Sequence, residues 1–115
     1  APMGCDAKGQ FYNINADTAA GTVANKIQAE RLLLMTDVPG VNDKNGNLIS
    51  KLTIAEAEEL IKNETITGGM IPKIKTCISA IRSGVKGVVI IDGRKAHAVL
   101  FELFSSAGAG TLIVQ

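Results

Sequence analysis

Residues 88–94 read VVIIDGR, four apolar residues followed by a polar turn, and this pattern is typical of a buried strand. Residues 32–35 read LLLM and are followed by Thr36 and Asp37. Neither run alternates apolar with polar side chains, which indicates a mainly parallel sheet covered on both faces. Ligands bind beyond the carboxyl ends of such strands, so the polar groups after both runs mark the edge where we expect a site.

Three helices are predicted from the spacing of apolar residues and from their terminal residues. The first begins at Asp17, the expected N-cap, and reaches about residue 28. The second begins at Thr53, which forms a capping box with Glu56. The third carries Pro72 in its first turn and ends at Gly84.

The remaining segments complete an alternation of strands and helices. Extended structure is expected over residues 10–14 and 111–114, and an amphipathic segment over residues 97–104. The Asn-Gly pair at residues 45–46 predicts a tight hairpin. We therefore predict an α/β fold, a three-layer αβα sandwich with a mainly parallel central sheet, as a single domain over residues 1–115.

Composition limits the possible functions. The 115 residues can form one domain with a sizeable core. Three Phe, one Tyr and no Trp make that core aliphatic and leave no stacking platform for nucleic acid. Twelve basic and eleven acidic residues give a formal charge of +1, which argues against nucleic acid or a membrane as partner. No apolar run could span a bilayer and no leader peptide is visible, so we expect a cytoplasmic protein.

Cysteine and histidine residues offer no obvious chemistry. Cys5 and Cys77 have no neighbouring Cys or His at metal-ligand spacing, so we expect two reduced thiols rather than a disulfide or a zinc site. His97, the single histidine, begins an apolar segment and is expected to pack there rather than to act in a catalytic triad.

Asn13, Asn15 and Asp17 bring three polar side chains to a predicted strand-to-helix corner. Their spacing by two residues would point all three the same way in an extended chain. The helix entry would favour a bound anion through its free N–H groups and dipole. The alternative is that Asp17 only caps the helix and that the asparagines are turn residues.

Lys73 is a second candidate, because residues 68–73 read GGMIPK and place a cation in the first turn of a helix. A cation at that position is destabilised by the helix dipole by about 0.3–1 kcal/mol, and a bound anion would turn this cost into a net stabilisation. The two glycines would let a phosphate approach the backbone. The alternative is a solvated surface lysine, which is the expectation for Lys75.

Four blocks of the sequence then occur in a recognisable order. They are NINAD at residues 13–17, LMTDVPGV at residues 34–41, GGMIPK at residues 68–73 and IIDGR at residues 90–94. Together they resemble the acetylglutamate kinases of the amino-acid kinase superfamily over essentially all 115 residues. The resemblance covers the carboxyl-terminal, ATP-binding half of such an enzyme, and the amino-terminal substrate-binding half has no counterpart here.

The resemblance implies ATP-dependent phosphorylation of the side-chain carboxylate of N-acetylglutamate, a step of arginine biosynthesis, with Mg²⁺ expected alongside ATP. Lys73 would stabilise the transferring phosphoryl group, Asp17 would orient the catalytic lysines, and Asn13 would hold the acetylglutamate. No protein ligand is assigned to the metal ion. The implied nucleotide-binding residues are Asp37, Val38, Pro39, Gly40, Val41, Asn42, Thr65, Ile66, Thr67 and Met70.

Further expectations follow from how much of the enzyme is matched. The first residues do not look like a natural start, so we expect a piece of a longer protein that is inactive alone. The intact enzyme is expected to be a homo-oligomer. One alternative is an isolated nucleotide-binding module without catalytic activity. Another is a kinase for glutamate, aspartate or uridylate, although those kinases lack the block at residues 13–17.

Overall fold

A four-stranded sheet forms the centre of the molecule in the computed structural model, which describes residues 2–115. The strands lie in the order β3 (Arg31–Thr36), β5 (Gly87–Asp92), β6 (Gly110–Val114) and β4 (Lys51–Thr53). β3 pairs with β5 in parallel and β4 pairs with β6 in parallel, whereas β5 and β6 are antiparallel. The sheet is therefore mainly parallel, as predicted, with its one antiparallel pair in the middle.

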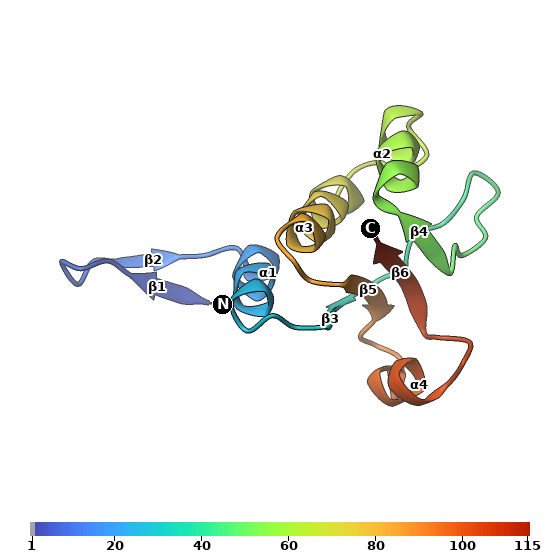
Figure 1. Cartoon of the computed structure of the whole chain (residues 1–115). Helices are drawn as coiled ribbons and strands as arrows, with labels where there is room; N and C mark the ends of the chain where they lie inside the picture. Colours follow the sequence, from blue (N-terminus) through green and yellow to red (C-terminus); the bar gives the residue numbers. More distant parts are fainter. Residues whose placement is uncertain (1) are drawn as a thin grey trace.

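Helices cover both faces of this sheet, which confirms the predicted three layers. Every residue of β5 is buried. Val88 and Ile90 pack into a core with α1 (Ala16–Lys26), α2 (Ile54–Lys62) and α3 (Met70–Arg82), and Val89 and Ile91 pack into a second core with α4 (Ala98–Phe104). Figure 1 shows α4 on the side of the sheet opposite to the other helices. Each buried Val or Ile side chain stabilises this arrangement by about 1.5–3 kcal/mol.

The chain before α1 forms an antiparallel hairpin that stands away from the sheet (Figure 1). Its strands are β1 (Met3–Cys5) and β2 (Phe11–Asn13), of which only β2 was predicted. The Asp6 carboxylate accepts the backbone N–H groups of Gln10 and Lys8 in the connecting turn, and these bonds lower the pKa of Asp6. β1 has no apolar run by which the sequence could reveal it.

The start of α1 differs from the prediction. Asn15, and not Asp17, is the N-cap, since its Oδ1 accepts the backbone N–H of Thr18 at 3.0 Å. The prediction of one extended run with three side chains on one side was also wrong, because the chain turns helical at Ala16. Asp17 therefore lies in the first turn of α1, and its carboxylate is free to bond elsewhere.

The start of α2 confirms the predicted capping box. Thr53 donates its backbone N–H to Glu56 Oε2 at 2.7 Å, and Glu56 donates its own N–H to Thr53 Oγ1 at 3.2 Å. The Glu56 carboxylate accepts hydrogen bonds from the backbone N–H and from the hydroxyl of Thr53, and these two bonds hold the pKa of Glu56 below its usual value. The short strand β4, which ends at Thr53, was not predicted.

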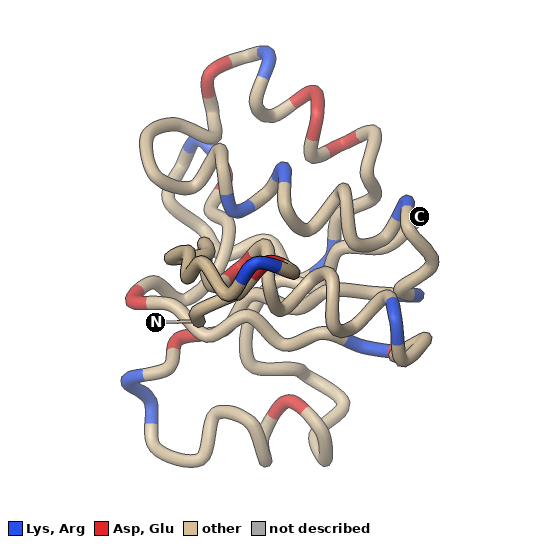
Figure 2. The backbone as a smooth tube through the Cα atoms, turned by 90° about the vertical axis from the view of Figure 1, so that its left-hand side faces the viewer, with Lys and Arg blue, Asp and Glu red and all other residues tan. Residues whose placement is uncertain are grey.

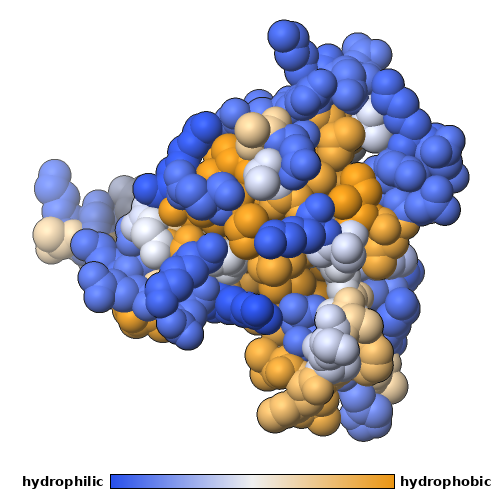
Figure 3. All heavy atoms as spheres, turned by 45° about the vertical axis from the view of Figure 1, so that its right-hand side comes forward, coloured by the Kyte–Doolittle hydropathy of each residue, from blue (hydrophilic) through white to orange (hydrophobic). Residues whose placement is uncertain are grey.

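The surface is mixed in charge and carries one apolar helix face. Figure 2 shows Lys and Arg interspersed with Asp and Glu along the chain. Figure 3 shows hydrophobic residues exposed around α4, where Phe101 and Phe104 are 54% and 83% exposed. Within residues 2–115, no helix has both the length and the apolar character needed to cross a membrane.

Candidate functional site

Two strands end side by side at the edge of the sheet where the site was expected. Thr36, the last residue of β3, lies opposite Asp92, the last residue of β5. Gly93 continues the pairing by donating its backbone N–H to the Thr36 carbonyl at 2.8 Å. Thr36 Oγ1 in turn lies 3.2 Å from Asp37 Oδ1 and donates to it. The polar residues after the two strands therefore form one connected edge.

Arg94 fixes the turn that follows β5. Its guanidinium donates from Nε to Asp92 Oδ1 and from Nη2 to Oδ2, each at 3.0 Å, and its backbone N–H also reaches Oδ1. The Asp92 side chain is nearly buried, and these hydrogen bonds lower its pKa to about 2. The same contact, and to a smaller degree the charge of Asp37, raises the pKa of Arg94.

Arg94→Met is expected to lower stability at neutral pH and to lose that effect in acid. The folded-state pKa of Asp92 lies below the ordinary 3.8, so its ion pair stabilises the fold above about pH 4 and is lost as the pH falls toward 2. Urea unfolding of both proteins at about pH 7 and about pH 3 measures the difference in stability. The pH dependence attributed to Asp92 is wrong if the difference is as large at the lower pH.

Asp17 and Lys73 form an ion pair between the first turns of α1 and α3. Lys73 Nζ lies 3.0 Å from Asp17 Oδ2, although the two residues are 56 positions apart. Both side chains are about one-quarter exposed, at 27% and 25%. Lys73 is therefore not a solvated surface lysine, and Asp17 holds an ion pair instead of capping the helix. The pair holds an ammonium group at the start of a helix, within reach of solvent.

The neighbourhood of this pair contains one candidate residue and one buried thiol. Asn13, the expected substrate contact, is exposed at the end of β2, four positions before Asp17. Cys77 lies one turn after Lys73 on α3, and burial together with the charge of Asp17 raises its thiol pKa to about 12. Cys77 thus stays a neutral thiol, and both it and Cys5 are free.

The first predicted nucleotide segment, residues 37–42, leaves the carboxyl end of β3. Asp37 and Asn42 are exposed at its ends, whereas Gly40 and Val41 are buried against the body of the protein. The segment continues into the predicted hairpin, in which Asn42 pairs with Leu48. Its exposed ends are thus available to a ligand while its middle is held by packing.

The second predicted segment, residues 65–67, leads into α3 and Met70. Ile66 is only 3% exposed and belongs to the core, so its backbone rather than its side chain could face a ligand. Val41, Ile66 and Met70 all pack into the same core cluster beneath α1, α2 and α3. Both predicted segments are therefore anchored on the same face of the sheet.

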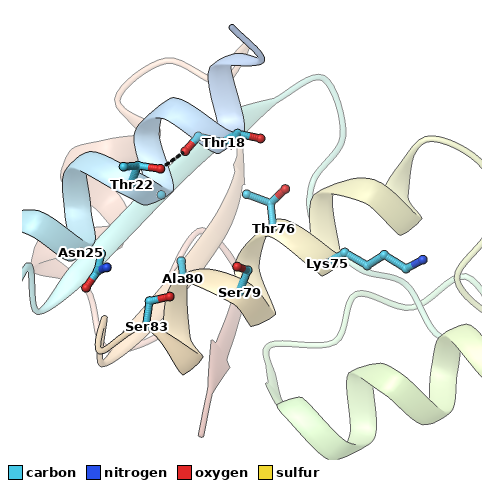
Figure 4. A pocket seen from close by; sticks show the side chains of 9 residues that line it. Thr18, Thr22, Asn25, Lys75, Thr76, Ser79, Ala80 and Ser83 are labelled. Carbon is cyan, nitrogen blue, oxygen red and sulfur yellow. Dashed lines mark hydrogen bonds between the residues drawn. The ribbon is translucent and has the colours of Figure 1, made fainter.

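A groove lies between α1 and α3, and neither residue of the ion pair lines it (Figure 4). It has a volume of about 280 Å³ and is lined mainly by small polar residues, among them Thr18, Thr22 and Ser79. Thr22 donates its hydroxyl to the Thr18 carbonyl of its own helix. The Lys75 side chain extends along α3 away from α1, as Figure 4 shows. This groove gathers no charged cluster.

The described residues provide no preformed metal centre. Within residues 2–115, no three His, Cys, Asp or Glu side chains gather closely enough to hold a metal ion. Asp17 is the carboxylate nearest to Lys73, and its Oδ2 already accepts a hydrogen bond from that lysine. A metal ion at this site would therefore need most of its ligands from a bound molecule and from water.

The three-layer fold, with its polar strand ends and its ion pair between two helix starts, agrees with the sequence comparisons. The Amino acid kinase family matches residues 1–92, and the chain belongs to that family. It is 60% identical, over all 115 residues, to the acetylglutamate kinase of Bartonella henselae. The chain spans only 38% of the length of that relative.

Solved structures support the same fold. The structure of N-acetylglutamate synthase from Neisseria gonorrhoeae, complexed with coenzyme A and L-arginine, matches 98% of this chain with a TM-score of 0.91 and 31% identity. The match covers 26% of that protein. Carbamate kinase from Giardia lamblia, bound to AMP-PNP, matches 98% of this chain and 37% of its own length. Its TM-score of 0.71 at 20% identity shows a shared fold alone.

Proposed function

We propose that this chain supplies the nucleotide-binding half of an acetylglutamate kinase, which transfers a phosphoryl group from ATP to the side-chain carboxylate of N-acetylglutamate in arginine biosynthesis. The observation that carries the proposal is the contact between Asp17 and Lys73, in a chain 60% identical to a named acetylglutamate kinase. The contact holds a cation at a helix start, where the electrostatic work of phosphoryl transfer requires one.

In the proposed reaction Lys73 stabilises the charge that develops on the transferring phosphoryl group. Asp17 orients the lysine through its hydrogen bond and does not act as a base, because the acceptor is already a carboxylate. Asn13 holds the acetylglutamate from the exposed end of β2. The 115-residue chain does not complete this reaction alone, since placing both substrates contributes several kcal/mol to such a step.

The nucleotide would lie at the carboxyl end of β3. Residues 37–42 leave that strand, and residues 65–67 and Met70, at the start of α3, share a core cluster with Val41. Mg²⁺ would be held chiefly by the nucleotide phosphates and water, which suits an ion that keeps several waters and takes few protein ligands. Bound Mg²⁺ would offset part of the negative charge of the phosphates, and Lys73 would supply the positive charge that comes from the protein.

Asp37→Ala is expected to weaken binding of MgADP to the 115-residue chain by roughly tenfold, the effect of losing one hydrogen bond to a charged group. Asp37 is exposed at the carboxyl end of β3, where the proposed nucleotide lies. Titration calorimetry measures the binding, which should be weak and saturable for the unchanged chain. Glu59→Ala, an exposed carboxylate on α2, is the matched control and should bind normally. Equal affinities for both variants would move the nucleotide site elsewhere.

A further inference from the structure

Thr111 is a fully buried polar residue at the start of β6, with none of its surface exposed. Its hydroxyl accepts the backbone N–H of Val41 at 2.8 Å and donates to the Ile49 carbonyl at 2.6 Å. Val41 and Ile49 face each other across a hairpin, since the Ile49 N–H donates to the Val41 carbonyl at 2.8 Å. One hydroxyl group therefore ties both arms of this hairpin to the central sheet.

The residue before Val41 also rests against Thr111. A Cβ atom added at Gly40 would lie 2.5 Å from Thr111 Oγ1 and 2.8 Å from Leu48 Cδ1. Gly40 has a φ of +153°, which a residue with a side chain rarely adopts. The close approach at Gly40 and the two hydrogen bonds of Thr111 together hold this part of the hairpin in a fixed position against the sheet.

The hairpin begins in the segment to which nucleotide binding is assigned above. Residues 37–42 run from the end of β3 to the hairpin bridge between Asn42 and Leu48. At one end this segment continues from β3, where Gly93 donates to the Thr36 carbonyl. At the other end it is held at Val41 by Thr111. The exposed residue Asp37 therefore lies between two fixed points.

We propose that Thr111 is a positioning residue for nucleotide binding: its hydroxyl holds the backbone of Val41, and so sets the course of residues 37–42. The inference rests on the proposed function, because it concerns the same nucleotide site. Thr111 itself is fully buried, so it would act through the backbone of this segment and not by contact with the nucleotide. Loss of the hydroxyl leaves a buried N–H and a partly buried carbonyl without this partner, which frees the segment to move.

Three substitutions separate the hydroxyl from the shape of the side chain. Thr111→Val replaces the hydroxyl with a methyl group, while Thr111→Ser and Thr111→Ala both remove the methyl group and differ in one oxygen atom. The valine and alanine variants should bind MgADP about tenfold more weakly in calorimetry and exchange the Val41 amide hydrogen faster by NMR. The serine variant should keep both properties close to those of the unchanged chain. If the valine variant fails to fold, the alanine and serine pair still decides the question.

Val85→Ala controls for a general loss of stability. Val85 is 1% exposed and precedes β5, at the opposite end of that strand from Asp92. Its truncation should lower stability but leave MgADP affinity and Val41 exchange unchanged in the folded protein. Equal weakening by Val85→Ala would assign the Thr111 effect to stability and overturn the positioning role.

The outcomes also separate this inference from the proposed function. If the unchanged chain does not bind MgADP, the assignment of the nucleotide site fails, and the role of Thr111 fails with it. If the unchanged chain binds MgADP and the Thr111→Ala variant binds equally well, only the positioning role is overturned. Weaker binding by the alanine variant, restored by serine, supports both.

Discussion

Lys73→Ala is expected to lower kcat by about 10²–10³-fold in an intact acetylglutamate kinase that contains this chain, the scale known for losing one preorganised electrostatic donor. Asp17 holds the Lys73 ammonium at 3.0 Å, so the charge is in place before the phosphoryl group is transferred. KM should change much less, because a group that acts mainly in the transition state contributes little to substrate binding. Steady-state kinetics with N-acetylglutamate and MgATP measures both parameters.

Lys75→Ala is the matched control for this experiment. Lys75 lies two positions further along α3, is exposed and points away from α1 in Figure 4. Its removal should leave kcat nearly unchanged. The Lys73→Ala variant should still fold, since a partly exposed ion pair contributes no more than about 1 kcal/mol. Near-normal kcat in both variants would show that Lys73 has no part in phosphoryl transfer.

Gly110→Ala is expected to destabilise the protein by about 3–5 kcal/mol, a large part of the stability of a domain of this size. Gly110 lies in β6, where a Cβ atom would overlap the Ile90 carbonyl oxygen and lie 2.9 Å from its carbonyl carbon. Both atoms belong to the backbone of β5 and cannot move aside like the end of a side chain. The central pair of strands would have to separate, and both cores rest on that pair.

Gly69→Ala is the control, because Gly69 precedes α3 with a φ of −66° and has no atom within 4 Å of an added Cβ. The free energy of unfolding of this variant should lie within about 0.5 kcal/mol of that of the unchanged protein. Urea unfolding followed by circular dichroism compares the three proteins. If Gly110→Ala unfolds at the same urea concentration as the unchanged chain, β5 and β6 do not approach each other as closely as described.

The buried strands could be predicted because their signal is local. β5 is apolar without alternation, and this pattern is typical of a strand that is covered on both faces. The direction of β6 leaves no such trace, since an apolar run reads the same in a parallel or an antiparallel pair. The antiparallel pairing at the centre of the sheet could therefore be known only from the structure.

The candidate site was predicted only in part, for related reasons. Asn15 and Asp17 are equally good N-caps by residue type, and spacing could not decide between them. The contact between Asp17 and Lys73 joins residues 56 positions apart, which no local pattern records. Thr111 is an ordinary residue for a strand, and only its burial between Val41 and Ile49 reveals what its hydroxyl does.

Finally, β3 has a strand neighbour on one side only within residues 2–115, namely β5. Its other edge presents backbone N–H and carbonyl groups that can accept a strand from a second molecule, and Met35 beside this edge is 55% exposed. Self-association through an open edge rises with protein concentration and competes with the folded monomer. Unfolding and titration experiments on the isolated chain therefore have to be compared at one dilute concentration, with the oligomeric state checked by light scattering.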